Sequence, residues 1–146
     1  MKSTTSIISL ARVLKKPSQI KRLYKLLNQR EYFISNSKKP SLSEHTRFVK
    51  AHPYRVWYLI EVDNIEIGSI YIKRDNSIGI NLLDENNALV PAILQELILR
   101  WKPLKPIPSV RPAGFYINVP SANSTLQKEI HKMGGKHIQN TYTVSA

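Results

Sequence analysis

Three β-rich segments joined by short turns form the middle of this chain and constrain its fold more than any other feature. They run over residues 56–62, 65–72 and 78–83, and isoleucine, valine, leucine and aromatic residues dominate them. The links, Asp63-Asn64 and residues 74–77, are typical of tight turns, so we expect an antiparallel meander of three strands. Few polar residues interrupt the first segment, which predicts that it lies inside a sheet with helices packed against both of its faces.

Segments with helical or strand patterns flank this meander and complete one domain. A chain of 146 residues suits one compact domain, which we expect to span residues 1–146. Apolar residues at helical spacing, a Ser-x-x-Glu capping box at Ser41–Glu44 and a Gly134-Gly135 stop indicate the helices. The predicted order is β-α-α-β-β-β-α-β-α-β, an α/β fold with a mixed sheet and helices on both faces. The flanking strands are expected at residues 7–14, 115–119 and 136–144, and the helices at residues 18–30, 41–52, 91–101 and 121–133.

The charge of the chain is strongly positive and unevenly distributed. There are 22 Lys and Arg against 10 Asp and Glu, a formal net charge of +12. Residues 1–55 hold 13 basic and 2 acidic side chains, whereas residues 56–146 hold 9 and 8. This excess favours an anionic partner, and we expect most of any basic face to come from the first third of the chain. Four aromatic residues lie among these charges and are candidates for stacking on nucleic-acid bases: Tyr24, Tyr32, Phe33 and Tyr54.

Several classes of protein and of site are excluded. The chain has no cysteine, which removes disulfides, thiolate metal sites and a cysteine nucleophile. His52, His131 and His137 show no metal-ligand spacing, so we expect no metal site. The apolar runs are far shorter than the ~20 residues of a membrane span, and no Gly-x-Ser-x-Gly, Walker or dinucleotide motif is present. We therefore expect a cytoplasmic protein without a membrane partner.

The element order, with two helices after the first strand, resembles the GNAT superfamily of acyl-CoA-dependent N-acetyltransferases over nearly the whole chain. Three stretches carry the resemblance. Residues 28–31 followed by Ser41–Phe48 look like the opening motif of members related to ribosomal-protein and amino-sugar acetyltransferases. Ile67-Gly68-Ser69-Ile70 matches a strand motif that is frequent in the family, and residues 118–135 are similar to its Asn-x-x-Ser-x-x-x-Tyr-x-Lys-x-Gly-Phe segment.

The resemblance implies acetyl-CoA as co-substrate and an amine as acceptor: an amino sugar, a protein N-terminus or a small amine. In the family, the N–H groups of a glycine-rich turn and of the following helix N-terminus bind the CoA pyrophosphate. Here Ala88 and Val90 stand where glycines are usual, so phosphate oxygens approach less easily, although the attraction of the helix terminus is kept. The implied cofactor-binding residues are Asn86, Asn87, Ala88, Leu89 and Val90 in this turn, Asn81, Leu82 and Leu83 around an oxyanion-stabilising N–H, and Asn123 on the CoA arm.

Three residues are candidates for the catalytic base, and each also has a purely structural interpretation. His45, with an ordinary pKa of about 6.5, lies in the helix that borders the acceptor site in the family, or it packs between helices. Glu61 lies in an otherwise apolar strand or marks its end, and Asp84 is a base or caps a turn. Asn123 likewise suits a helix cap. Ile130 aligns with a tyrosine that protonates the leaving thiolate in many relatives, and isoleucine has no proton to donate.

Two functions therefore stay open. The first is an N-acetyltransferase that moves an acetyl group from acetyl-CoA to a primary amine. The alternative is a non-catalytic protein of the same fold that binds a partner, such as nucleic acid or the ribosome, through its basic N-terminal third.

Overall fold

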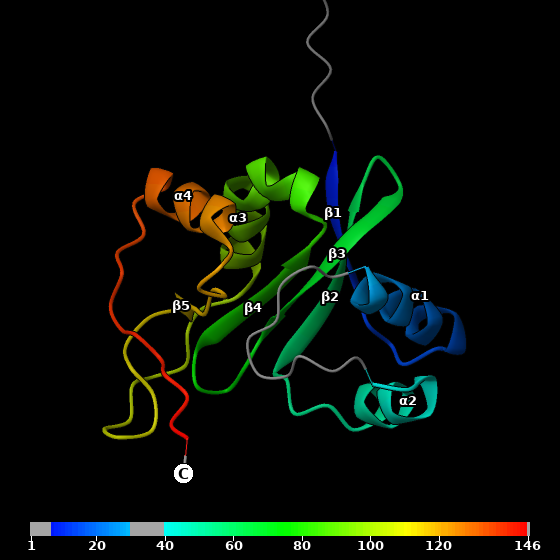
Figure 1. The fold of residues 1–146 in the computed structure, drawn as a ribbon, viewed down its shortest axis with the longest axis horizontal. Helices are drawn as coiled ribbons and strands as arrows, with labels where there is room; N and C mark the ends of the chain where they lie inside the picture. Colours follow the sequence, from blue (N-terminus) through cyan, green and yellow to red (C-terminus); the bar gives the residue numbers. More distant parts are fainter. Residues whose placement is uncertain (1–6, 30–39, 146) are drawn as a thin grey trace, which may run out of the picture.

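A single mixed β-sheet forms the centre of the molecule (Figure 1). The computed structural model describes residues 7–29 and 40–145. The five strands follow the order β1-β2-β3-β4-β5, antiparallel as far as β4 and parallel between β4 and β5. The elements are β1 (Ile8–Arg12), α1 (Pro17–Asn28), α2 (Leu42–Lys50), β2 (Val56–Val62), β3 (Ile65–Ile72), β4 (Ser77–Leu82), the 3₁₀ helix η1 (Asp84–Leu89), α3 (Val90–Arg100), β5 (Tyr116–Ile117) and α4 (Ser124–Lys132).

Strand β2 is buried on both faces, as its sequence predicts. Its alternate residues Trp57 and Leu59 pack against α1 and α2 in one apolar cluster. Tyr58 and Ile60 point the other way and pack against α3 and α4 in a second cluster. Figure 1 shows the same arrangement, with α1 and α2 on one side of the sheet and α3 and α4 on the other. The predicted α/β fold with helices on both faces is therefore confirmed.

A β-bulge interrupts the pairing of β2 with β3. Ile60 pairs with Gly68 but the next residue, Glu61, pairs with Glu66, so Ile67 is the extra residue. A Cβ atom on Gly68 would lie 2.1 Å from the carbonyl oxygen of Asn81 on β4. Only glycine fits this close approach of two strands, which explains the glycine in the Ile-Gly-x-Ile motif.

The end of the chain differs from the predicted order. Residues 136–145 form no strand, and Ile138, Tyr142 and Val144 are exposed. The strand expected at residues 115–119 is reduced to the two residues of β5. Strand propensity expresses how well a side chain fits a half-buried pleated surface. The two residues of β5 offer little surface of this kind, so the β-rich composition of residues 136–144 is not sufficient to form a strand. The helix before it does stop where predicted, at Gly134 with φ of +94°.

Asn76, in the turn between β3 and β4, forms hydrogen bonds to the proline-rich connection between α3 and β5. It is fully buried and has φ of +71°, a conformation that Asn adopts more easily than most residues. Its side-chain amide donates to the carbonyls of Leu104 at 2.9 Å and Pro112 at 3.0 Å, and its side-chain oxygen accepts from the N–H of Leu104 at 2.8 Å. One side chain thus holds two distant points of an irregular segment.

Replacing Asn76 with alanine should destabilise the protein much more than the same change at Asn64. Both residues have positive φ, but Asn64 is exposed in the turn between β2 and β3. Asn76→Ala removes three hydrogen bonds worth about 1 kcal/mol each in addition to the strain that both variants share. Denaturant unfolding should therefore show a loss about 3 kcal/mol larger for Asn76→Ala than for Asn64→Ala. Equal losses would show that the three bonds contribute nothing net.

Candidate functional site

Strands β4 and β5 separate after two residue pairs, which leaves one edge of β4 open. Ser77 pairs with Tyr116 and Ile78 with Ile117, whereas pairing with β3 continues to Leu82. The second half of β4 therefore has a sheet neighbour on one side only. The resemblance places an oxyanion-stabilising N–H at such a divergence of the fourth and fifth strands.

The backbone N–H of Leu82 points toward the open edge. In an antiparallel ladder, successive residues direct their N–H and C=O groups to opposite sides of the strand. Leu83 donates its N–H to Ile67 of β3 at 3.2 Å, and Ser77 accepts from Lys73 at 2.9 Å on the same side. The backbone N–H and C=O groups of the odd-numbered residues of β4 thus point toward β3. Those of the even-numbered residues, including the N–H groups of Ile80 and Leu82, point toward the side of β5. Of the three residues Asn81, Leu82 and Leu83, Leu82 has the orientation that a substrate oxygen would need.

A shallow pocket lies beside the bulge and the end of β4. It encloses about 180 Å³ including space open to solvent. The pocket combines the C-terminal half of α1 with the two strands that meet at Gly68. The sequence predicted three of its lining residues, Asn81, Leu82 and Leu83, and missed the other three. Two of the missed residues, Ile67 and Gly68, belong to the Ile-Gly-x-Ile motif. The lining residues are Leu26, Ile67, Gly68, Asn81, Leu82 and Leu83.

The run expected to bind the CoA pyrophosphate is a 3₁₀ helix and not an open turn. The N–H of Asn86 donates to Leu83 at 2.9 Å, and the N–H of Val90 donates to Asn87. Within a 3₁₀ helix each N–H bonds to the carbonyl three residues earlier, so the run satisfies most of its own amides. Val90, the first residue of α3, is fully buried in the core, and Leu89 packs against the same cluster. A pyrophosphate would therefore need this run to open before it could bind several of its amides.

Asn123 and His45 both have structural roles in the fold. Asn123 caps α4, because its side-chain oxygen accepts the N–H of Leu126 at 3.2 Å. His45 is 6% exposed between α1 and α2, with its ring 5.3 Å from the ring of Tyr24. Burial lowers the pKa of His45, and a backbone hydrogen bond with Ile20 offsets part of this effect. Its Nε2 atom has no hydrogen-bond partner among the described residues.

The backbone positions of the other two candidate bases lie at the same end of the sheet as the pocket. Glu61 on β2 faces Glu66 of β3 across the bulge, and Glu66 also pairs with Arg22 of α1 at 3.2 Å. Asp84 begins η1 directly after Leu83, which lines the pocket. The structure therefore does not bring His45 and Glu61 together around the pocket.

Within the described parts of the chain, no helix is long and apolar enough to cross a membrane. Nor do three His, Asp or Glu side chains gather there in a group that could hold a metal ion.

Comparisons with known proteins find similarity in structure only. No protein-family model matches the chain, and no curated protein matches it in sequence. Among solved structures, the aminoglycoside N-acetyltransferase AAC(6')-Iy in complex with CoA superposes with a TM-score of 0.57 at 10% identity, over 100% of this chain and 99% of the enzyme. A complex of AAC(6')-Iy with the bisubstrate analogue CoA-S-monomethyl-acetylneamine gives 0.58 at 11% identity, over 98% and 99%.

A possible acetyltransferase from Clostridium difficile 630 is also similar, with a TM-score of 0.53 at 13% identity over 98% of this chain and 99% of that one. These matches cover essentially the whole chain. The chain therefore has the fold of these acetyltransferases, which is the fold that the sequence resemblance predicts.

Stability should depend on pH through the buried histidine. The pKa of His45 is lowered in the folded state, so between that pKa and about 6.5 the unfolded chain binds more protons than the folded one. The free energy of unfolding should therefore fall as the pH drops below about 6.5. Burial and Lys15 also lower the pKa of His52, which contributes in the same direction.

His45→Gln should reduce this loss of stability at low pH, and the exposed His131→Gln on α4 serves as the matched control. Urea unfolding of the three proteins across the acid range provides the measurement. A pH dependence that is identical in wild type and His45→Gln would contradict the assignment.

Proposed function

We propose that this chain is an N-acyltransferase that moves an acetyl group from acetyl-CoA to a primary amine. The single observation that supports this most is the open edge of β4, where the N–H of Leu82 faces the divergence from β5 in a chain with an acetyltransferase fold. An amide held in a strand is already oriented before the substrate arrives. Such preorganised donors are the main source of transition-state stabilisation in acyl transfer.

The proposed reaction proceeds in two steps at this edge. The neutral amine attacks the carbonyl carbon of the thioester, and the resulting oxyanion accepts a hydrogen bond from the N–H of Leu82. The tetrahedral intermediate then collapses, the carbon–sulfur bond breaks, and CoA leaves as a thiolate while the amine loses a proton to a base. Ile130 on α4 has no proton to give, so the thiolate leaves without an acid at that position.

Asp84 is the proton acceptor that we favour among the three candidates. It follows the pocket-lining Leu83 directly in the chain. His45 is enclosed between α1 and α2, and Glu61 lies on β2, two strands away from β4 and its open edge. The side chain of Asn123 caps α4, so the contact with the CoA arm that the resemblance implies would have to share this residue with the cap.

The proposed acceptor is an amino sugar or another small amine. AAC(6')-Iy, which has the same fold, binds a bisubstrate analogue that joins CoA to acetylneamine. In this chain the pocket lies at the end of the sheet that holds the carboxylates of Glu61, Asp63 and Glu66. These negative charges attract a protonated amine from solution, and the amine gives up one proton to solvent before it attacks in its neutral form.

The form of η1 favours a second function, a non-catalytic protein that keeps the fold and has lost acetyl transfer. Its internal hydrogen bonds and the burial of Val90 leave few amides for a pyrophosphate. Isothermal titration with acetyl-CoA, followed by an assay of CoA release with a panel of amines, separates the two. Heat on titration and turnover support the enzyme, and binding without turnover supports the second function. The absence of heat at millimolar acetyl-CoA would contradict the enzyme.

Leu82→Pro should lower kcat by about 10²- to 10³-fold, since it removes one oxyanion-hole donor. Proline is tolerated where a strand edge is free, and the N–H of Leu82 makes no ladder bond to β3. Leu82→Ala keeps the N–H and is the matched control, for which kcat should change little. The affinity for acetyl-CoA, measured by titration, should change far less than kcat in both variants. Equal kcat values in the two variants would remove the oxyanion role from Leu82.

A further inference from the structure

One end of the sheet collects most of the basic side chains of the described structure. This end contains the end of β1, the start of β2, the turn between β3 and β4, and the proline-rich connection after α3. Because adjacent strands are antiparallel as far as β4, segments far apart in the sequence meet here. The basic residues are Arg12, Lys15, Lys16, Arg55, Lys73, Arg74, Arg100, Lys102, Lys105 and Arg111, which we call the basic end.

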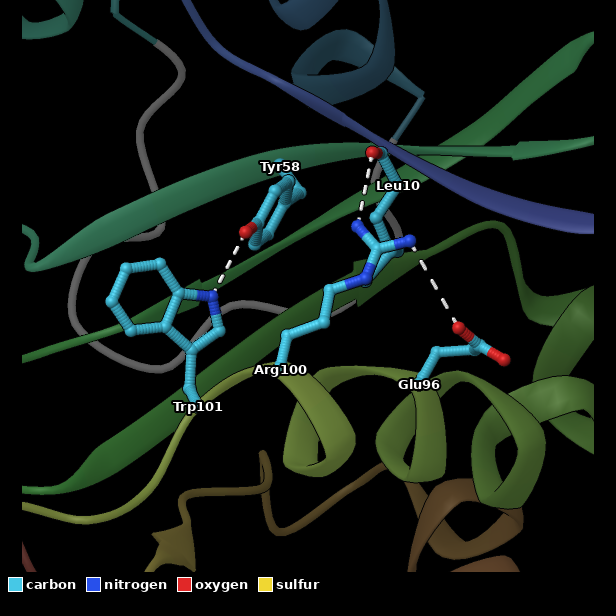
Figure 2. A network of polar contacts seen from close by, with 5 residues as sticks. All are labelled: Leu10, Tyr58, Glu96, Arg100 and Trp101. Carbon is cyan, nitrogen blue, oxygen red and sulfur yellow. Dashed lines mark hydrogen bonds and ion pairs between the residues drawn. The ribbon is translucent and has the colours of Figure 1, made fainter.

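Trp101 connects the first part of the basic end. The guanidinium carbons of Arg12 and Arg55 lie 6.0 Å and 5.1 Å from the centre of its ring. Arg55 also donates to the carbonyl of Lys102 at 2.8 Å. Figure 2 shows how Trp101 is held, with its indole N–H donating to the hydroxyl of Tyr58 at 2.8 Å. Cations held against an aromatic ring are fixed in position without losing their charge.

Arg111 connects the second part. Its guanidinium donates to the carbonyl of Lys105 at 2.6 Å and to the carbonyl of Arg74 at 3.4 Å. Together with the hydrogen bonds of Asn76 to Leu104 and Pro112, these contacts hold the connection against the turn between β3 and β4. These contacts therefore fix the basic residues of the connection next to those of the turn.

Few carboxylates neutralise this surface. Within the segments that form it, Asp75 accepts hydrogen bonds from the N–H of Ser77 at 2.9 Å and from its hydroxyl at 2.5 Å. Glu96 on α3 lies 3.9 Å from Arg100, a long ion pair on an exposed helix face (Figure 2). The opposite end of the sheet instead holds the acidic residues Glu61, Asp63, Glu66, Asp84 and Glu85.

Aromatic side chains lie next to the basic end. Phe48 is 43% exposed near the end of α2 and contacts Tyr54 edge to face at 5.7 Å. Tyr54 stacks on Tyr71 of β3 at 3.8 Å, so its ring is held rigidly. The positive charge of Lys15 is close enough to His52 to lower the pKa of its imidazole. Tyr24 instead packs on His45, and Tyr32 and Phe33 lie outside the described residues.

We propose that the basic end binds single-stranded nucleic acid, with its Lys and Arg on the phosphates and Phe48 as a stacking surface for a base. Guanidinium groups already positioned by aromatic rings and carbonyls match phosphate oxygens in geometry and lose little freedom on binding. A basic track beside an exposed, supported aromatic ring is the combination that single-stranded nucleic acid requires. This surface draws on residues 73–111 as well as on the N-terminal third, and it does not depend on acetyl transfer.

Fluorescence anisotropy with a short labelled single-stranded RNA tests the proposal, at salt from about 50 to 200 mM. The triple variant Arg12→Gln, Lys73→Gln, Lys105→Gln removes three basic-end charges from exposed side chains. Its control, Lys25→Gln, Lys128→Gln, Lys136→Gln, removes three exposed charges from α1, α4 and the C-terminal segment. The basic-end variant should bind more weakly, and the slope of log affinity against log salt should become shallower by about 2. The control should keep the slope of the wild type, and thermal unfolding shows whether each variant is folded.

Phe48→Leu provides a second test, because it keeps an apolar side chain and removes the ring. Loss of one stacked base should weaken RNA binding about tenfold. Saturating acetyl-CoA should leave RNA binding unchanged, since the pocket lies at the other end of the sheet. Equal effects of the two triple variants, displacement of RNA by acetyl-CoA, or equal competition by polyglutamate would overturn the proposal, as would the absence of binding by the wild type.

Discussion

The burial of β2 on both faces is the constraint on which the rest of the structure depends. Its odd-numbered residues complete the cluster under α1 and α2, and its even-numbered residues complete the cluster under α3 and α4. Ile60 is completely inaccessible and Leu59 nearly so, so a shift of β2 by one residue would exchange the two cores. This strand therefore fixes the register of the meander, and with it the position of the bulge at Ile67 and the course of β4. The open edge at Leu82 follows from that register.

The meander and its helices could be predicted because their patterns are local. Alternation and helical spacing within single segments indicated β2, β3, β4 and the helices, and the capping box at Ser41 forms as expected, with Ser41 and Glu44 bonded to each other. The strand at residues 136–144 could not be judged in this way, because a strand exists only with a partner and β5 is too short to supply a surface. The run at 86–90 was predicted as an open turn by resemblance. Residues 86–89 instead belong to a 3₁₀ helix and Val90 begins α3, because the apolar Leu89 and Val90 pack into the core.

The candidate site was predictable in part for the same reason. Leu82 and Leu83 were predicted by applying the family resemblance to the end of the fourth strand, whereas Leu26 reaches the pocket from a helix whose placement no local pattern encodes. His45 was a reasonable candidate from its chemistry, and burial between α1 and α2 makes it a packing residue with a lowered pKa. The basic end was missed because its residues come from four segments that only the topology brings together. Counting charges by thirds of the sequence pointed to the first third, although Lys73, Arg74 and Arg111 belong to the same surface.

The sheet separates the two kinds of charge along its strands, and this separation makes two sites compatible in one small domain. Successive turns of an antiparallel meander lie at opposite ends of the sheet, so Asp63 lies at one end and Arg74 at the other. Under the two proposals, the carboxylates near the pocket attract a protonated amine and the basic end attracts the phosphates of a nucleic acid. At physiological salt the fields of exposed charges fall off over about 8 Å, whereas a strand of eight residues such as β3 spans roughly 26 Å. The two proposals are therefore compatible, because a nucleic acid at the basic end leaves the open edge of β4 accessible to an amine.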